Sequence, residues 1–145
     1  MNTDKTNAQL PQTIVSVSVT DVRVGNLIFN DYGEIQPIYG VDEKSILTKV
    51  DVNGWSICFK PKGVPISEEW LFKFGFIKYG KLHDSYKLNP FIVELGILGN
   101  HYTFRKIMTK DESMLLKEMK CVHELQNLYF SITGSELQIG SITEH

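Results

Sequence analysis

Between residues 13 and 60 the chain is divided into short apolar segments that are separated by clusters of turn-forming residues. The segments recur at a spacing of about ten residues, which is typical of small all-β folds. Three of the separating clusters, at 30–33, 42–45 and 51–54, are rich in Asn, Asp, Ser or Gly. We therefore expect residues 13–60 to form a small antiparallel structure, either an SH3-like barrel or an open, strongly twisted sheet.

The strands of this region are predicted from alternating residue types and from the positions of the turns. Apolar residues alternate with serines over 13–19, and apolar segments also occur at 35–41, 46–50 and 55–59. Pro37 lies inside the second of these four segments. Because proline has no N–H to donate to a neighbouring strand, Pro37 indicates an edge strand or a bulge.

A short helix is predicted after the proline-containing loop at 60–65. Ser67 is a suitable N-cap, and the two glutamates that follow it favour the positive end of a helix. Gly75 is expected to end this helix in the left-handed conformation. A helix of about two turns is not stable alone, so packing must hold it, and Trp70 is the expected point of attachment to the core.

The rest of the chain is predicted to contain a strand at 76–79, a hairpin of strands at 91–95 and 102–107, and a C-terminal helix. In the segment 123–133, apolar residues recur every three or four positions, which indicates an amphipathic helix, and Gly134 is its expected C-cap.

Two further segments of the C-terminal half are less regular. The pattern at 114–121 is compatible with a helix or with a strand. Leu137 and Ile139 alternate with polar residues and predict a short last strand.

Length and composition favour one α+β domain. The chain has 145 residues, of which 42% are hydrophobic, so a core is formed without disulfides or metals. We expect a flexible tail at 1–12 and a domain at 13–145, made of a barrel-like subdomain (13–60) and a helix/sheet subdomain (66–145). The sequence has no apolar run of bilayer length and no signal peptide, so we expect a cytoplasmic protein without a membrane partner.

No motif for a known type of catalysis is found. The sequence has no phosphate-binding loop, no nucleophile elbow and no zinc-protease helix. Its two cysteines, Cys58 and Cys121, are expected to be buried thiols, and no two of its four histidines have the spacing of metal ligands on a helix. We therefore expect a protein that is not an enzyme and that uses no metal or cofactor.

The distribution of charge is less even than the net charge of −2 indicates. Residues 60–87 carry six basic and three acidic side chains, whereas the segments 1–59 and 88–145 have net charges of −3 and −2. Aromatic residues lie between the lysines, an arrangement that suits phosphates and stacked bases. The candidate ligand-binding residues of this basic segment are Lys60, Lys62, Lys73, Lys78, Tyr79 and Lys81. The alternative is an ordinary solvated surface over core aromatic residues.

The predicted C-terminal helix also has a polar stripe. His123, Gln126, Asn127 and Phe130 share one face and form a candidate contact surface for a partner. The alternative interpretation is that these side chains satisfy backbone groups of neighbouring loops.

Three blocks of the sequence resemble a group of small uncharacterised proteins of phages and mobile elements of gut anaerobic bacteria. The blocks are Val-Arg-Val-Gly-Asn at 22–26, Pro-Ile-Ser-Glu-Glu-Trp-Leu at 65–71 with Lys-Phe-Gly-Phe at 73–76, and Val-His-Glu-Leu-Gln-Asn-Leu-Tyr-Phe at 122–130 with Thr-Gly at 133–134. The resemblance implies one integrated fold and a phage or prophage origin. The group has no assigned activity, so the resemblance transfers no functional residue.

These observations lead to three hypotheses of function. The first is a non-catalytic phage accessory protein that binds and occupies a host macromolecule, with an anti-defence role. The second is a protein that binds or sequesters a nucleotide through the basic segment 60–87, and the third is binding to nucleic acid. A homo-oligomer is a further hypothesis, with identical chains associating through an edge near Pro37 or through the apolar side of 114–119.

Overall fold

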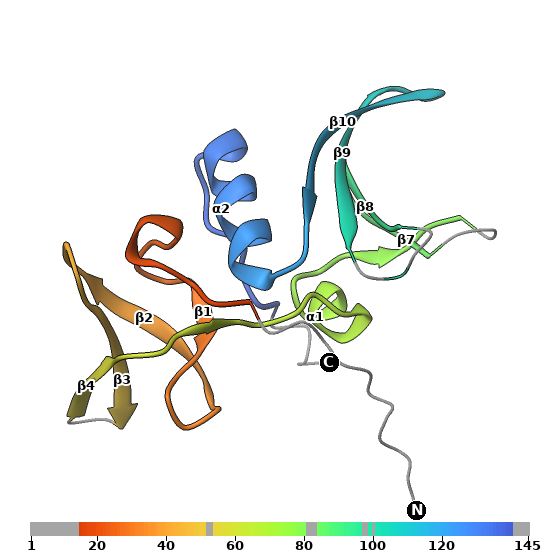
Figure 1. Ribbon diagram of the computed structural model, residues 1–145. Coiled ribbons are helices and arrows are strands. Elements are labelled where there is room, and N and C mark those ends of the chain that lie inside the picture. Colours follow the sequence, from red (N-terminus) through yellow and green to blue (C-terminus); the bar gives the residue numbers. More distant parts are fainter. Residues whose placement is uncertain (1–14, 52–53, 81–83, 97–98, 100, 141–145) are drawn as a thin grey trace, which may run out of the picture.

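The computed structural model describes residues 15–51, 54–80, 84–96, 99 and 101–140. It is an α+β protein with two antiparallel sheets of five strands each and two α-helices. Figure 1 shows helix α2 (Val122–Thr133) standing between the two sheets. Among the described residues, no helix is both long and apolar enough to cross a membrane.

The first sheet has the strand order β4-β3-β2-β1-β5. Its strands are β1 (Leu27–Phe29), β2 (Ile35–Val41), β3 (Ile46–Asp51), β4 (Gly54–Cys58) and β5 (Lys62–Gly63). The two edge strands, β4 and β5, do not pair with each other. The sheet is therefore open and not a closed barrel, and its strands agree with those predicted at 35–41, 46–50 and 55–59.

Pro37 does not mark an edge strand. Strand β2 lies between β1 and β3, and Pro37 pairs with Leu27 of β1. The pairing of β2 with β3 extends only as far as Ile38, and the register shifts between Ile38 and Gly40. Because β3 does not pair with Pro37, the missing N–H breaks no hydrogen bond, and the bulge interpretation is the right one.

The predicted strand at 13–19 is wrong where the structure describes it. Ser16 makes a single antiparallel bridge to Lys62, and Val19–Asp21 form a 3₁₀-helix. The Asp21 carboxylate accepts hydrogen bonds from the backbone N–H and the hydroxyl of Ser18, at 3.2 and 3.1 Å. These local bonds offer the backbone an alternative to strand pairing. The predicted tail at 1–12 lies outside the described residues.

The second sheet has the strand order β10-β9-β8-β7-β6. Its strands are β6 (Ile77–Lys78), β7 (Ser85–Leu88), β8 (Phe91–Leu95), β9 (Tyr102–Thr109) and β10 (Glu112–Met119). The predicted hairpin is present as β8 and β9, and the ambiguous segment at 114–121 is extended up to Met119. The sequence predicts no strand at the position of β7.

Helix α1 (Glu68–Lys73) begins and ends as expected. The Ser67 hydroxyl accepts a hydrogen bond from the N–H of Trp70 at 3.3 Å, which caps the first turn. Gly75 follows the helix with φ +93°, a conformation that residues with a Cβ rarely adopt.

Trp70 is not the main contact of α1 with the core. Leu71 is fully buried and Phe74 is almost so, whereas Trp70 is only partly buried. The Trp70 ring lies against Phe74 on one side, with ring centroids 5.8 Å apart, and the Lys73 ammonium lies 4.6 Å from its centre. The aliphatic and phenyl groups of the other two residues therefore hold the helix on the second sheet.

Helix α2 has the predicted extent and ends at Gly134, which has φ +77°. The predicted last strand at 137–139 is absent from the described residues. Leu137 is buried in the core, and the Gly140 N–H donates to the Lys73 carbonyl at 2.7 Å. This backbone is therefore held by the end of α1 rather than by a strand.

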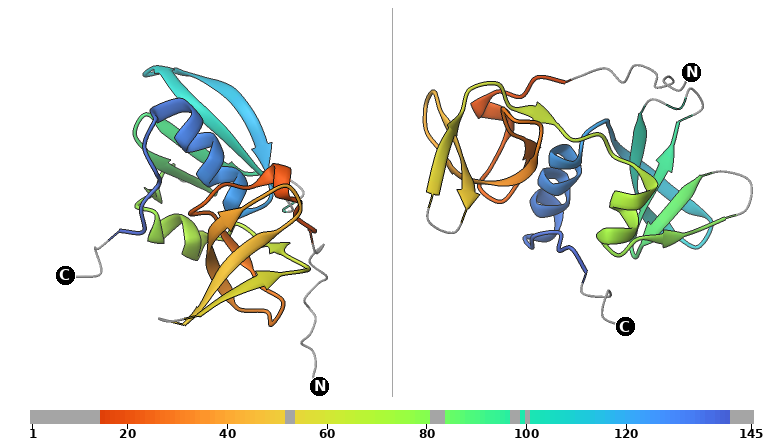
Figure 2. Two further views of the ribbon diagram at one scale, coloured as in Figure 1. Left: turned by 90° about the vertical axis from the view of Figure 1, so that its left-hand side faces the viewer. Right: turned by 90° about the horizontal axis from the view of Figure 1, so that it is seen from below.

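Two hydrophobic cores result. The smaller core covers one face of the first sheet and includes Ile28, Ile38 and Ile46. The larger core lies between the second sheet, α1 and α2, and Leu27 and Phe29 of β1 also pack against it. Figure 2 shows the first sheet on one side of α2 and the second sheet on the other. Strands β3 and β4 lie at the end of the molecule farthest from the second sheet (Figures 1 and 2).

Candidate functional site

The candidate residues of the basic segment lie on different elements. Lys60 follows β4, and Lys62 lies in β5 of the first sheet. Lys73 ends α1, Lys78 lies in β6 of the second sheet, and Tyr79 follows it. Lys81 lies outside the described residues.

Lys78 is engaged by acidic groups of the protein itself. Its Nζ lies 3.1 Å from Glu68 Oε2 and 3.4 Å from Asp84 Oδ1. The Tyr86 hydroxyl donates to the same Glu68 oxygen at 2.9 Å. The bond to Lys78 lowers the pKa of Glu68, and the bond to Glu68 raises the pKa of Lys78. Burial, and then the same carboxylate, raise the pKa of Tyr86 to about 12.

Other lysines are also paired. Lys73 forms an ion pair with Glu69 at 3.5 Å, and the ammonium of Lys87 lies 5.0 Å from the ring centre of Tyr79. The described residues form two surface hollows of about 490 and 420 Å³, and neither is lined by a candidate lysine. The two hollows thus give no support to a ligand site at these lysines, and nucleotide or nucleic-acid binding there stays a prediction.

On α2, Gln126 is a buried side chain that connects the helix to the first sheet. Its Oε1 accepts the backbone N–H of Leu27 at 2.9 Å, and its Nε2 donates to the carbonyl of Gly25 at 3.3 Å. Gly25 lies in the bend before β1, and Leu27 is the first residue of β1. The amide therefore satisfies loop backbone, as the structural alternative predicted.

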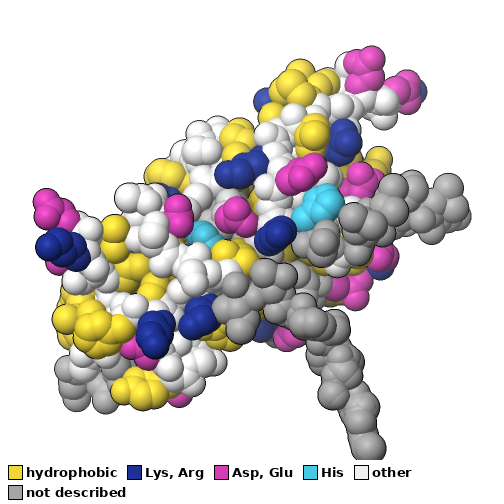
Figure 3. All heavy atoms as spheres, viewed as in Figure 1, with side chains coloured by type: hydrophobic (Ala, Val, Ile, Leu, Met, Phe, Trp, Pro, Cys, Tyr) yellow, Lys and Arg dark blue, Asp and Glu magenta, His cyan; other side chains and the backbone are white. Residues whose placement is uncertain are grey.

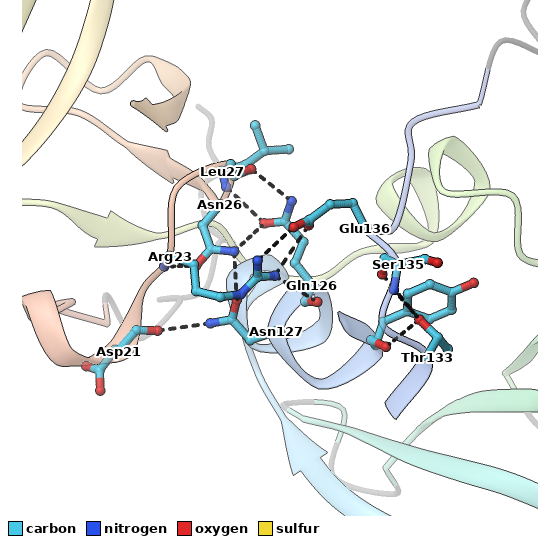
Figure 4. A network of polar contacts seen from close by, with 11 residues as sticks. Asp21, Arg23, Asn26, Leu27, Gln126, Asn127, Thr133, Ser135 and Glu136 are labelled. Atoms are coloured by element: carbon cyan, nitrogen blue, oxygen red, sulfur yellow. Dashed lines mark hydrogen bonds and ion pairs between the residues drawn. The ribbon is translucent and has the colours of Figure 1, made fainter. Parts of the chain in front are cut away.

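Asn127 is the centre of a second set of contacts, shown in Figure 4. Its Oδ1 accepts from Arg23 Nε at 2.9 Å and from Asn26 Nδ2 at 2.8 Å, and its Nδ2 donates to the carbonyl of Asp21 at 3.1 Å. Arg23 also forms an ion pair with Glu136 at 2.7 Å. We use the name inter-sheet network for the side chains of Arg23, Asn26, Gln126, Asn127 and Glu136.

Phe130 also contacts the inter-sheet network, because the Arg23 guanidinium lies 4.3 Å from the centre of its ring. Of the four candidate contact residues on α2, His123 and Gln126 are buried. Asn127 is partly buried, and 37% of the Phe130 surface is exposed. The polar stripe therefore mainly connects α2 to the first sheet inside the protein.

His123 lies at the start of α2 with only 5% of its surface exposed. Its Nδ1 atom is buried and has no hydrogen-bond partner. Burial lowers the pKa of His123, although the carboxylates of Glu124 and Asp21 oppose this shift. The side chain forms part of the wall of the larger hollow, whose other residues are Val15, Ser16, Asp21, Lys117, Glu124, Asn127, Leu128 and Ser131.

Both cysteines are free and buried, as predicted. Burial raises the pKa of each thiol to about 11, and the hydrogen bond from Cys58 Sγ to Asp31 contributes at that site. A thiol with this pKa is protonated at neutral pH and is a poor nucleophile. Within the described ranges, no three His, Cys, Asp or Glu side chains are grouped so that they could hold a metal ion.

The second face of the first sheet lies outside both cores where β2, β3 and β4 form it, and there it carries mostly apolar residues, with Lys49 paired opposite Trp55. Leu47 of β3 pairs with Ile57 of β4, so both side chains lie on this face together with Trp55. The ring of Tyr39 in β2 meets the Trp55 ring edge to face, with centroids 5.6 Å apart. Trp55, Ile57 and Tyr39 are 60%, 44% and 40% exposed. We call Tyr39, Leu47, Trp55 and Ile57 the outer face.

Figure 3 shows hydrophobic side chains gathered over the end of the molecule that β3 and β4 form. The outer face was not predicted as a site, although the sequence holds a signal for it. Strand β4 places Trp55 and Ile57 on one face and the small residues Gly54, Ser56 and Cys58 on the other. Large apolar residues that alternate with small ones along a strand indicate a contact surface on the face that holds the large ones.

Comparison of the chain with protein-family models, with curated proteins and with solved structures found no match.

Proposed function

We propose that this protein is a non-catalytic binding protein that docks onto another protein through its outer face. The observation that carries the proposal is the exposure of neighbouring aromatic and aliphatic side chains on adjacent strands. Single exposed apolar residues are ordinary, but a contiguous group of them is typical of an interaction site. Trp and Tyr are also the residues that most often dominate binding energy at protein interfaces.

The net charge of the first sheet favours a protein partner over a nucleic acid, although Lys49 pairs with Trp55 of the outer face. Residues 27–60 carry five acidic and three basic side chains, so this part of the chain has a net charge of −2. A surface on which bases stack needs basic groups beside the rings to bind the phosphates. Together with the resemblance to phage proteins, this makes a host protein the partner that we propose.

The proposal is tested by capture of a partner with the wild-type chain and with two variants. Trp55→Ser removes the largest exposed ring of the outer face, and Ile77→Ser is the matched control, because Ile77 is 65% exposed on the second sheet. The captured protein is then purified and titrated against each chain. We expect Trp55→Ser to weaken binding by at least about tenfold and Ile77→Ser to leave it unchanged, as for a central aromatic contact.

Equal binding by the wild-type chain and Trp55→Ser would contradict the proposal. So would the recovery of no partner in stoichiometric amount. Because Trp55 is mostly exposed, its replacement should leave the fold intact, which circular dichroism of the variant checks.

A further inference from the structure

The four edge strands of the two sheets differ in how they are protected. Unpaired edges attract further strands, and proteins normally protect them by cover, by charge, by bulges or by short length. In this structure β5 is covered, because the N–H of Gly63 donates to the carbonyl of Val15 and the N–H of Val17 donates to the carbonyl of Pro61. The residues at 15–17 thus occupy that edge.

The second sheet protects both of its edges. Strand β6 has two residues, one of which is Lys78. Strand β10 carries Glu112, Lys117 and Glu118, and its register shifts at two positions. Charge and irregular pairing both discourage the addition of another strand.

Strand β4 lacks the cover and the charge that protect the other edges in the part of the chain that the structure describes, and its pairing with β3 is irregular at one place only, between Lys49 and Asp51. Its five residues, Gly54–Cys58, include no charged residue and no proline. Among the described residues it pairs with β3 alone, and no backbone hydrogen bond between these residues joins it to a loop or turn. Beyond the end of the strand, the Asp31 carboxylate accepts hydrogen bonds from the N–H groups of Phe59 and Lys60 at 2.9 and 2.7 Å.

We infer that β4 receives an extended segment of the partner protein, which adds to the first sheet as a sixth strand. This inference rests on the proposed function, because the added strand lies beside Trp55 and Ile57 of the outer face. Alternate backbone groups of a strand point away from its one neighbour, so β4 offers N–H and C=O groups to a second neighbour. An added segment with apolar side chains at every second position would extend the outer face.

The net charge of the first sheet indicates which kind of partner segment would bind. A second copy of this chain would bring the same net charge of −2 over residues 27–60 beside the first. A segment with Lys or Arg at the positions that alternate with its apolar residues has the complementary charge. The proposed partner is therefore an extended segment that alternates apolar and basic residues.

The test uses peptides, with the full chain as the target. A displayed library of random peptides is selected for binding to the chain, and the best binder is synthesised with single N-methyl groups along its backbone. An added strand bonds through every second N–H of the peptide. We expect enrichment of alternating apolar and basic residues, and a loss of affinity of about tenfold or more on N-methylation at alternate positions only.

Amide exchange of the protein gives a second readout that needs no variant. Binding of the selected peptide should slow exchange of those β4 amides that do not bond to β3. The matched control for binding is again Ile77→Ser at the β6 edge, which should bind the peptide as the wild-type chain does.

The outcomes separate the two proposals. If Trp55→Ser loses the partner but N-methylation has no effect and β4 amides stay unprotected, docking through the outer face stands and strand addition is wrong. If no peptide is enriched and no partner depends on Trp55, both are wrong. If the chain without peptide is a dimer with protected β4 amides, the edge belongs to a second copy and the inference is overturned.

Discussion

The imidazole of His123 is held in its neutral form by its surroundings. It is buried at the start of α2, and burial lowers its pKa below the ordinary value of 6.5. In the unfolded chain the same group takes up a proton near its ordinary pKa. As the pH falls through 6.5, the unfolded chain therefore binds a proton that the folded chain does not bind, and stability decreases.

We predict that the free energy of unfolding decreases between about pH 7 and about pH 5, and that His123→Gln reduces this decrease. Glutamine keeps a polar group of similar size but does not titrate in this range. Urea unfolding of both chains at several pH values measures the effect. Parallel curves for the two chains would show that His123 does not contribute to it.

The polar residues of α2 also show what sequence alone can indicate about a site. Gln126 and Asn127 are predicted to satisfy loop backbone or to contact a partner, and their spacing is the same in either case. The choice depends on whether the bend before β1 lies against α2, which is a contact between residues about one hundred positions apart. Local pattern carries no information on such a contact.

At the scale of elements, the prediction succeeds where turn and cap residues are explicit. Asn, Asp, Ser and Gly at their expected positions account for the turns at 30–33 and 42–45, for the N-cap of α1, for the glycines that end both helices and for the strands β2, β3 and β4. The prediction fails where contacts between distant residues determine the local structure. Strand β7 is formed because β6 and β8 pair with it on both sides, and the segment at 137–139 remains without a strand because α1 binds its backbone.

The close approach of β5 to α2 depends on the absence of a side chain at Gly63. A Cβ at Gly63 would overlap Cys121 Sγ and would lie 3.3 Å from His123 Cε1. Gly40 is a matched comparison, since a Cβ there would meet the flexible end of Leu47 at 3.2 Å. The two glycines thus differ in how easily their neighbours move.

We predict that Gly63→Ala lowers the free energy of unfolding by about 1–3 kcal/mol, as overpacked substitutions do. Gly40→Ala should change it by less than about 0.5 kcal/mol, because the Leu47 side chain can shift toward solvent. Chemical denaturation of both variants measures the difference. Equal effects of the two substitutions would mean that β5 moves away from α2 without loss of stability.

At the scale of the whole molecule, the two sheets are connected by few contacts other than those of α2. The first sheet has its own small core, and the larger core belongs to the second sheet and the helices. Between them lie the inter-sheet network and the apolar contacts of Leu27 and Phe29. The outer face and the β4 edge therefore belong to a part of the molecule whose position relative to the second sheet depends on the inter-sheet network and on these apolar contacts.

We predict that Gln126→Leu uncouples the first sheet from the rest of the protein. Leucine leaves the N–H of Leu27 and the carbonyl of Gly25 without their partner at a partly buried site, which costs about 1–2 kcal/mol. Amides of β1 to β3 should then exchange faster, while those of β7 to β9 keep their wild-type rates, because the larger core is not altered. Ser131→Ala, an exposed change on the same helix, is the control. Faster exchange by the same factor in both sheets would show instead that the protein opens as one cooperative unit and that the inter-sheet network is not its weakest point.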